Sequence, residues 1–132
     1  MAQTMNTQVC FLLVALAFRV YAAQPEDECA GTTYDESVCL SKIYKQADAN
    51  LNTVYQKAIT SAAHFGEKDI ANLKDAERKW IAYRDATCKA EYNLWGGGSG
   101  GPNALARCLI QLTRERTVRL NAGFYRFWQN SN

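Results

Sequence analysis

The sequence of 132 residues has little of what several kinds of functional site require. It contains one histidine, His64, and no Cys-x-x-Cys pair, so we expect neither a zinc site nor a histidine-based pH switch. It has no basic block, since 15 Lys and Arg are nearly balanced by 13 Asp and Glu, and nucleic-acid binding is therefore not expected. Its paired carboxylates are of the surface type and face no evident cleft. We expect no catalytic residues, no enzyme activity and no cofactor.

No stretch alternates polar and apolar residues at a period of two, so no sheet is predicted. Apolar residues instead recur at spacings of three and four, which predicts three helices at about 35–64, 68–93 and 103–128. Thr33 and Glu36 could form a capping box, Gly66 is a natural stop, and Pro102 suits a first helical turn. The predicted fold is all-α, an elongated up-down bundle of three main helices. The inward stripes are Leu40, Ile43, Ala47, Leu51, Val54, Ala58 and Ala62, then Ile70, Leu73, Ala76, Trp80, Tyr83 and Thr87, and then Leu105, Cys108, Leu109, Leu112, Arg116, Leu120 and Phe124.

No apolar run is long enough to span a bilayer. The longest, from Val9 to Phe18, has the length of a signal-peptide core and is followed by small residues at the offsets that signal peptidase requires. We predict a signal peptide over residues 1–22 and one domain over residues 23–132, although no Lys or Arg precedes the apolar run. A buried N-terminal helix is the alternative. No lipobox precedes Cys10 or Cys29, so no membrane anchor is expected.

Five cysteines are an odd number, but Cys10 would leave with the signal peptide. The remaining four, Cys29, Cys39, Cys88 and Cys108, allow three pairings. We favour Cys29–Cys39 and Cys88–Cys108, because each closes a local loop. Disulfides form in oxidising compartments, so a periplasmic or secreted protein is expected.

The glycine-rich segment after Trp95 formally matches two catalytic patterns, G-x-S-x-G and G-x-G-x-x-G. Neither has the preceding strand that its chemistry requires, so both matches reflect composition alone. The segment is then either a flexible connector between Cys88 and Cys108 or a protruding loop that enters a partner's cleft. The candidate binding residues are Trp95, Gly97, Gly98, Ser99, Lys89 and Arg107.

A second cluster combines aromatic and charged residues on the two later helices. Trp80 and Tyr83 are expected in the core, and an arginine on an apolar seam usually pairs with a carboxylate or stacks on a ring. We predict an ion-pair network between helices, with recognition by exposed guanidinium groups as the alternative. Asn52 is expected to form a hydrogen bond between helices. The cluster comprises Asn52, Trp80, Tyr83, Arg84, Asp85 and Arg116, with Asp85, Glu77 and Glu115 as possible carboxylate partners.

The chain resembles the LprI-like lysozyme-inhibitor family over roughly residues 29–121. The matching segments are Leu51-Asn52-x-Val54-Tyr55, Arg78-Lys79-Trp80-Ile81-x-Tyr83-Arg84-Asp85-x-x-Cys88, Gly97/Gly98-Ser99, and Cys108-x-x-x-Leu112-Thr113-x-x-Arg116-x-x-x-Leu120. The resemblance implies an exported helical domain with paired cysteines that inhibits a lysozyme by binding it as a protein partner. The alternative function is an envelope interaction or immunity-like module with a different protein partner. Oligomeric state is not predicted.

Overall fold

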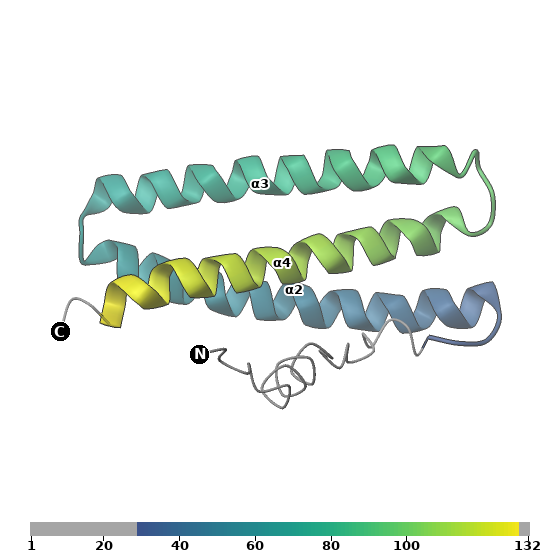
Figure 1. Ribbon diagram of the computed structural model, residues 1–132, viewed down its shortest axis with the longest axis horizontal. Helices are drawn as coiled ribbons and strands as arrows, with labels where there is room; N and C mark the ends of the chain where they lie inside the picture. Colours follow the sequence, from purple (N-terminus) through teal and green to yellow (C-terminus); the bar gives the residue numbers. More distant parts are fainter. Residues whose placement is uncertain (1–28, 130–132) are drawn as a thin grey trace, which may run out of the picture.

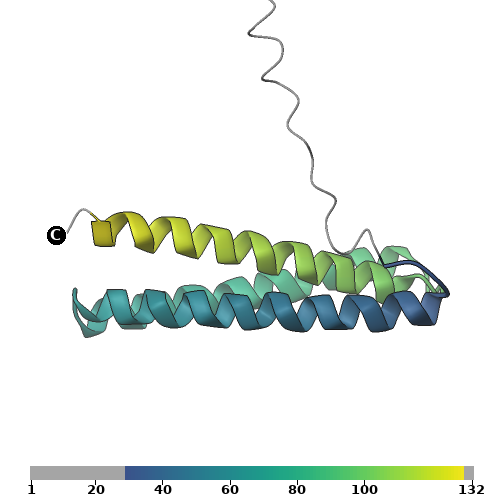
Figure 2. The same ribbon diagram turned by 90° about the horizontal axis from the view of Figure 1, so that it is seen from below.

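The computed structural model describes residues 29–129, with side chains up to residue 123. The predicted signal peptide lies outside these residues. The described chain folds into three helices, α2 (Thr33–Ala63), α3 (Glu67–Leu94) and α4 (Gly101–Gln129), and contains no strand. They run side by side in up-down order along the long axis of the molecule (Figures 1 and 2). The predicted all-α bundle is confirmed, and the predicted helix ends lie within two residues of the observed ones.

Helix α2 begins at a capping box one residue earlier than predicted. The N-cap is Thr32, whose side chain accepts a hydrogen bond from the backbone N–H of Asp35 at 3.2 Å. The Asp35 carboxylate in turn accepts from the Thr32 backbone N–H at 3.0 Å. The predicted pair, Thr33 and Glu36, is therefore wrong by one position. This capping box gives hydrogen-bond acceptors to backbone N–H groups that have no partner within the first helical turn.

Both disulfides have the predicted partners. Cys29, just before α2, is bonded to Cys39 within α2, and Cys88 of α3 is bonded to Cys108 of α4. The second bond joins the two helices close to the loop between them. We call the end of the bundle that carries this loop the stapled end; α2 also begins there (Figure 1).

The core consists of two apolar clusters. The cluster nearer the stapled end contains Cys29, Leu40 and Ile110, with Cys39, Ile43, Tyr44 and Ala106 packed against it. The other contains Leu51, Ala58, Ala62, Leu73 and Leu120, with Val54, Tyr55, Ile59, Ile70 and Trp80 packed against it. The stripe predicted for α2 is thus buried or half-buried throughout.

The stripe predicted for α3 is partly wrong. Ala76 is exposed, and Tyr83 is 60 % exposed although it was expected in the core. The buried positions lie one residue further along, at Glu77 and Arg84, in line with Leu73 and Cys88, which are also buried. The sequence analysis placed Arg84 in an ion-pair network between helices and named Glu77 as a possible carboxylate partner, and both residues are buried on this face. They can be buried here because each is paired with polar groups.

Candidate functional site

The loop between α3 and α4, residues 95–100, is a closed turn. Gly96 and Gly97 have φ values of 57° and 82°, in the left-handed region that side chains with a Cβ rarely adopt. The Gly98 N–H donates to the Trp95 carbonyl at 2.9 Å, and the Gly101 N–H donates to the Gly98 carbonyl at 3.0 Å. The loop is therefore folded on itself rather than extended between the two cysteines.

The last glycines of this segment allow close contact with aromatic rings. A Cβ on Gly100 would lie 2.8 Å from Cζ3 of Trp95, and one on Gly101 would lie 3.1 Å from Cε2 of Tyr92. Trp95 thus has one part of its ring against the loop, while 54 % of the residue remains exposed. This contact fixes the position of a large aromatic side chain at the surface.

The stapled end exposes several apolar side chains. Leu94, next to Trp95, is 86 % exposed, and Ser99 within the loop is also exposed. Tyr34 and Val38, from the start of α2, are exposed at the same end of the bundle. Large exposed apolar groups on a fixed turn are typical of protein-binding surfaces.

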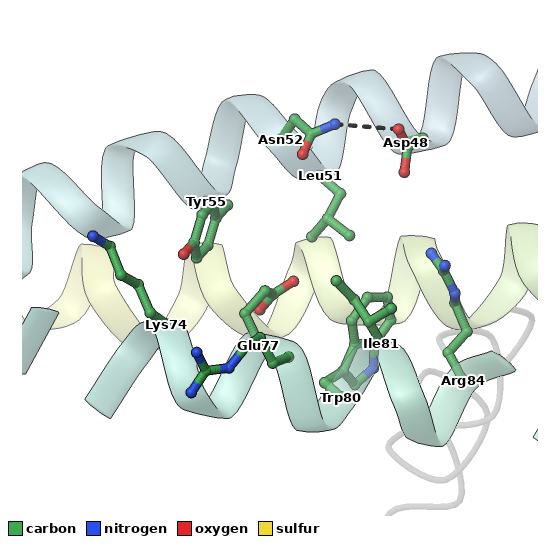
Figure 3. A pocket seen from close by; sticks show the side chains of 10 residues that line it. Asp48, Leu51, Asn52, Tyr55, Lys74, Glu77, Trp80, Ile81 and Arg84 are labelled. Carbon is green, nitrogen blue, oxygen red and sulfur yellow. Dashed lines mark hydrogen bonds between the residues drawn. The ribbon is translucent and has the colours of Figure 1, made fainter. Parts of the chain in front are cut away.

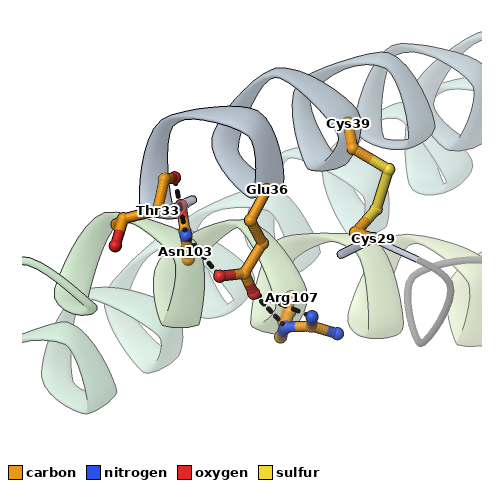
Figure 4. A network of polar contacts seen from close by, with 6 residues as sticks. All are labelled: Cys29, Thr33, Glu36, Cys39, Asn103 and Arg107. Carbon is orange, nitrogen blue, oxygen red and sulfur yellow. Dashed lines mark hydrogen bonds and ion pairs between the residues drawn. A yellow bond between two sulfur atoms is a disulfide. The ribbon is translucent and has the colours of Figure 1, made fainter. Parts of the chain in front are cut away.

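The two basic candidates near this loop have intramolecular partners. The Lys89 ammonium lies 4.3 Å from the centre of the Tyr92 ring. The Arg107 guanidinium forms an ion pair with the Glu36 carboxylate at 2.8 Å. Figure 4 shows that Arg107 points along α4 toward α2, where it connects the two helices. Arg107 is therefore a structural contact at the stapled end, while Lys89 remains exposed.

Sequence reasoning did not find the other members of this network. Buried Asn103 donates from its side-chain amide to the Glu36 carboxylate at 2.7 Å and to the Thr33 carbonyl at 3.2 Å (Figure 4). Hydrogen bonding by Arg107, and next by Asn103, lowers the pKa of Glu36 below its ordinary value of 4.5. Helix α4 is thus attached to the first turn of α2 by charged and neutral hydrogen bonds.

A second polar network, which we call the polar belt, lies between the two apolar clusters. It comprises Glu77, Trp80, Arg84, Thr113 and Arg116. The Arg116 guanidinium donates to the Glu77 carboxylate at 2.7 Å and 3.0 Å, and Arg84 donates to the Thr113 hydroxyl at 3.3 Å. The guanidinium carbons of Arg84 and Arg116 lie 5.2 Å and 5.6 Å from the centre of the Trp80 ring. The belt therefore connects α3 to α4 through ion pairing and cation–π contact.

Arg84 has two further partners outside the belt. It forms an ion pair with neighbouring Asp85 at 2.8 Å, and its guanidinium carbon lies 6.0 Å from the Tyr44 ring centre on α2. Its side chain is only 10 % exposed, so the guanidinium is not presented to a partner molecule. These contacts place Arg84 in the structure of the bundle rather than on a recognition surface.

Two other sequence interpretations differ from the structure. Asn52 is exposed and donates to Asp48 at 3.2 Å, on its own helix rather than to another. Glu115 likewise accepts from Gln111 on its own helix. Neither side chain forms the contact between helices that was expected of it. The stripe predicted for α4 is buried or half-buried from Leu105 to Leu120, as expected. The inward face of α4 also includes residues that this stripe left out, some of them polar: Asn103, Ala106, Ile110, Thr113 and Thr117.

A groove lies between α2 and α3, with α4 behind it (Figure 3). Its volume is about 390 Å³, within the usual range of small-ligand sites. Its lining residues are Asp48, Leu51, Asn52, Tyr55, Lys74, Glu77, Arg78, Trp80, Ile81 and Arg84. Over residues 29–123, no group of His, Cys, Asp and Glu side chains could hold a metal ion. None of the described helices is long and apolar enough to cross a bilayer.

These features define a class: a disulfide-linked three-helix domain that exposes an aromatic loop at one end. The family model for lysozyme inhibitor LprI matches residues 26–120. A protein from Rhizobium meliloti (strain 1021), described as uncharacterized, is 34% identical over 122 residues, which cover 83% of this chain and 87% of that protein. No solved structure matches the chain significantly. The chain belongs to the LprI lysozyme-inhibitor family, as the motifs in its sequence indicated.

Proposed function

We propose that this protein is an exported inhibitor of a lysozyme-type peptidoglycan hydrolase and acts by binding the enzyme through its glycine loop. Family membership supports the inhibitor role, and inhibition by binding requires no catalytic residue in this chain. Two disulfides fit an oxidising compartment, which supports a periplasmic or secreted location.

The exposed pair Leu94 and Trp95 is the observation that carries the loop assignment. Their exposed fractions are 86 % and 54 %, and the adjacent turn is closed by its own hydrogen bonds. A fixed aromatic side chain loses little conformational entropy on binding, so it can contribute strongly to an interface. The Cys88–Cys108 bond lies close behind this turn and supports its position.

Polar groups near the same loop suit the chemistry of a lysozyme cleft. Such clefts carry two catalytic carboxylates. The exposed Ser99 hydroxyl can donate a hydrogen bond to a carboxylate, and the Lys89 ammonium can exchange its contact with Tyr92 for an ion pair. Arg107 is assigned no role in binding, because it already connects α4 to Glu36.

The test is inhibition of c-type and g-type lysozymes by the purified protein with both disulfides formed. Trp95→Ala is expected to weaken inhibition about 30-fold, the effect of losing an interface hot spot. Leu94→Ala should weaken it in the same direction without affecting packing. The matched control is Phe65→Ala, because Phe65 is 61 % exposed at the α2–α3 turn, at the opposite end of the bundle.

The possible outcomes separate the enzyme target from the binding surface. Failure of the unaltered protein to inhibit either lysozyme type would contradict the inhibitor proposal. An equal loss of inhibition in Trp95→Ala and Phe65→Ala would contradict the loop assignment alone. If neither lysozyme is inhibited but Trp95 is needed to capture another envelope protein, the module with a non-lysozyme partner becomes the better description.

A further inference from the structure

The groove between α2 and α3 contains charged side chains of two kinds, which differ in whether their charge is already compensated. Three of them belong to α3 and have ion-pair partners. Glu77 is paired with Arg116, Arg78 with Asp75, and Arg84 with Asp85. The first and third are also buried. Because the charges of these three side chains are compensated by their partners, they contribute little to attracting a charged ligand.

Asp48 and Lys74 are different. Within the described residues, Asp48 accepts one hydrogen bond, from the Asn52 amide, and has no ion pair. Lys74 is exposed and has no ion pair or hydrogen bond with the described part of the chain. Figure 3 shows Asp48 near one end of the groove and Lys74 beside Tyr55 near the other end. The groove thus has an uncompensated negative charge at one end and a positive charge at the other.

Between these two charges, the groove has an apolar floor and a polar wall. Leu51, Trp80 and Ile81 supply the floor. On the α2 side, the Asn52 carbonyl oxygen and the Tyr55 hydroxyl have no hydrogen-bond partner among the described residues. Such groups can pair with the amides of a peptide backbone. An apolar side chain of that peptide could rest on the floor.

The length of the groove also suits a short peptide. Asp48 and Tyr55 are seven positions apart on α2, which at the helical rise separates them by about 10 Å. Three extended residues span about the same distance. We propose that this groove binds a free, unblocked tripeptide with an apolar central residue. Its terminal ammonium pairs with Asp48 and its terminal carboxylate pairs with Lys74. The site is independent of the glycine loop and of the inhibitor function.

Amide NMR titration with the tripeptide Ala-Leu-Ala tests this proposal on the purified protein with both disulfides formed. Saturable shifts are expected in α2 around residues 48–55 and in α3 around residues 74–81. Asp48→Asn and Lys74→Met should each weaken binding about two- to fivefold, the effect of losing one exposed ion pair. Asn at position 48 keeps an oxygen for the Asn52 hydrogen bond, so the local structure is retained. Lys42→Met is the matched control, because Lys42 is exposed on α2 but does not line the groove.

A charge-swapped variant makes the test independent of general effects on the helices. Asp48→Lys and Lys74→Glu should each weaken binding, whereas the two together should recover most of it, because the tripeptide can then bind in the reverse direction. The same peptide with acetylated and amidated ends should bind at least about fivefold more weakly than the free peptide. Equal binding of blocked and free peptides, or shifts elsewhere than in the groove, would overturn the proposal. If the groove instead binds a blocked peptide with internal Lys and Asp residues more tightly than the free tripeptide, the proposal is also overturned. The ligand would then be an internal segment of a partner protein.

Discussion

The two halves of this bundle are held together in different ways. The half at the stapled end contains both disulfides, the Glu36–Asn103–Arg107 network and a buried cluster of only three residues. The other half contains no cross-link among the described residues and has the larger apolar cluster, which includes Leu51 and Leu120. Cross-links thus occur where apolar burial is smaller. They also occur where the protein exposes its glycine loop.

This difference indicates how a thin bundle can expose a binding loop and remain folded. Apolar side chains at the stapled end, such as Leu94 and Trp95, face solvent and do not contribute to a core. Covalent bonds and specific hydrogen bonds there replace the stabilisation that burial would give. The polar belt joins the two halves. Three sets of variants test this comparison. They change the polar belt, the Cys88–Cys108 disulfide and Glu36, and their expected effects on the free energy of unfolding decrease in that order.

The largest effect is expected at Glu77 in the polar belt. Its side chain is 9% exposed and accepts two hydrogen bonds from Arg116. Glu77→Ala should lower the free energy of unfolding by about 3–4 kcal/mol, because it leaves the Arg116 charge nearly buried without a carboxylate. Urea unfolding followed by circular dichroism measures this loss.

The control for Glu77 is the double variant Glu77→Met, Arg116→Met. Replacing both members of a buried ion pair by apolar residues of similar size is often nearly neutral, so the double variant should be clearly more stable than Glu77→Ala. If both variants are equally unstable, the belt acts through side-chain packing and not through its charges.

A smaller effect is expected from removing the disulfide between α3 and α4. Cys88 and Cys108 are separated by 20 residues, and the double variant Cys88→Ala, Cys108→Ala should lose about 3 kcal/mol through the added entropy of the unfolded chain. Urea unfolding followed by circular dichroism measures this loss, and hydrogen exchange of the variant should show lower protection within residues 88–108 than in α2 around Leu51. Equal protection of these two segments in the variant would contradict the separation into two halves.

Much of this fold could be predicted from the sequence. The spacing of Leu40, Leu51 and Ala58 predicts α2 correctly, because apolar side chains at helical spacing must share a buried face. Both disulfide partners also follow from local loop closure. The inward face of α3 could not be found this way. Its buried residues include Glu77 and Arg84, whose burial depends on partners from elsewhere in the chain.

The candidate site was predicted less completely. Trp95 and Ser99 could be proposed from sequence, since a glycine-rich segment between two helices has to form a loop. That the loop is closed depends on contacts such as the Trp95 ring against Gly100, which composition does not show. The sequence likewise could not show that Arg107 pairs with Glu36, because these residues are 71 positions apart. Long-range pairing decides which charged groups remain available to a partner.

The smallest of the three effects is expected at Glu36, and its magnitude depends on pH. The pKa of Glu36 is lower in the folded protein than its ordinary value of 4.5, because Arg107 and then Asn103 donate hydrogen bonds to its carboxylate. The unfolded chain therefore binds the proton more readily, so this contribution to stability is complete above about pH 4.5 and is lost as the pH falls through the folded pKa. Glu36→Gln should lose about 1 kcal/mol at neutral pH, because it keeps an oxygen for Asn103 but removes the ion pair with Arg107. Urea unfolding of both proteins between pH 7 and pH 3 should show this difference shrinking in acid. A difference that stays constant over this range would mean that Glu36 stabilises the stapled end through packing and neutral hydrogen bonds alone.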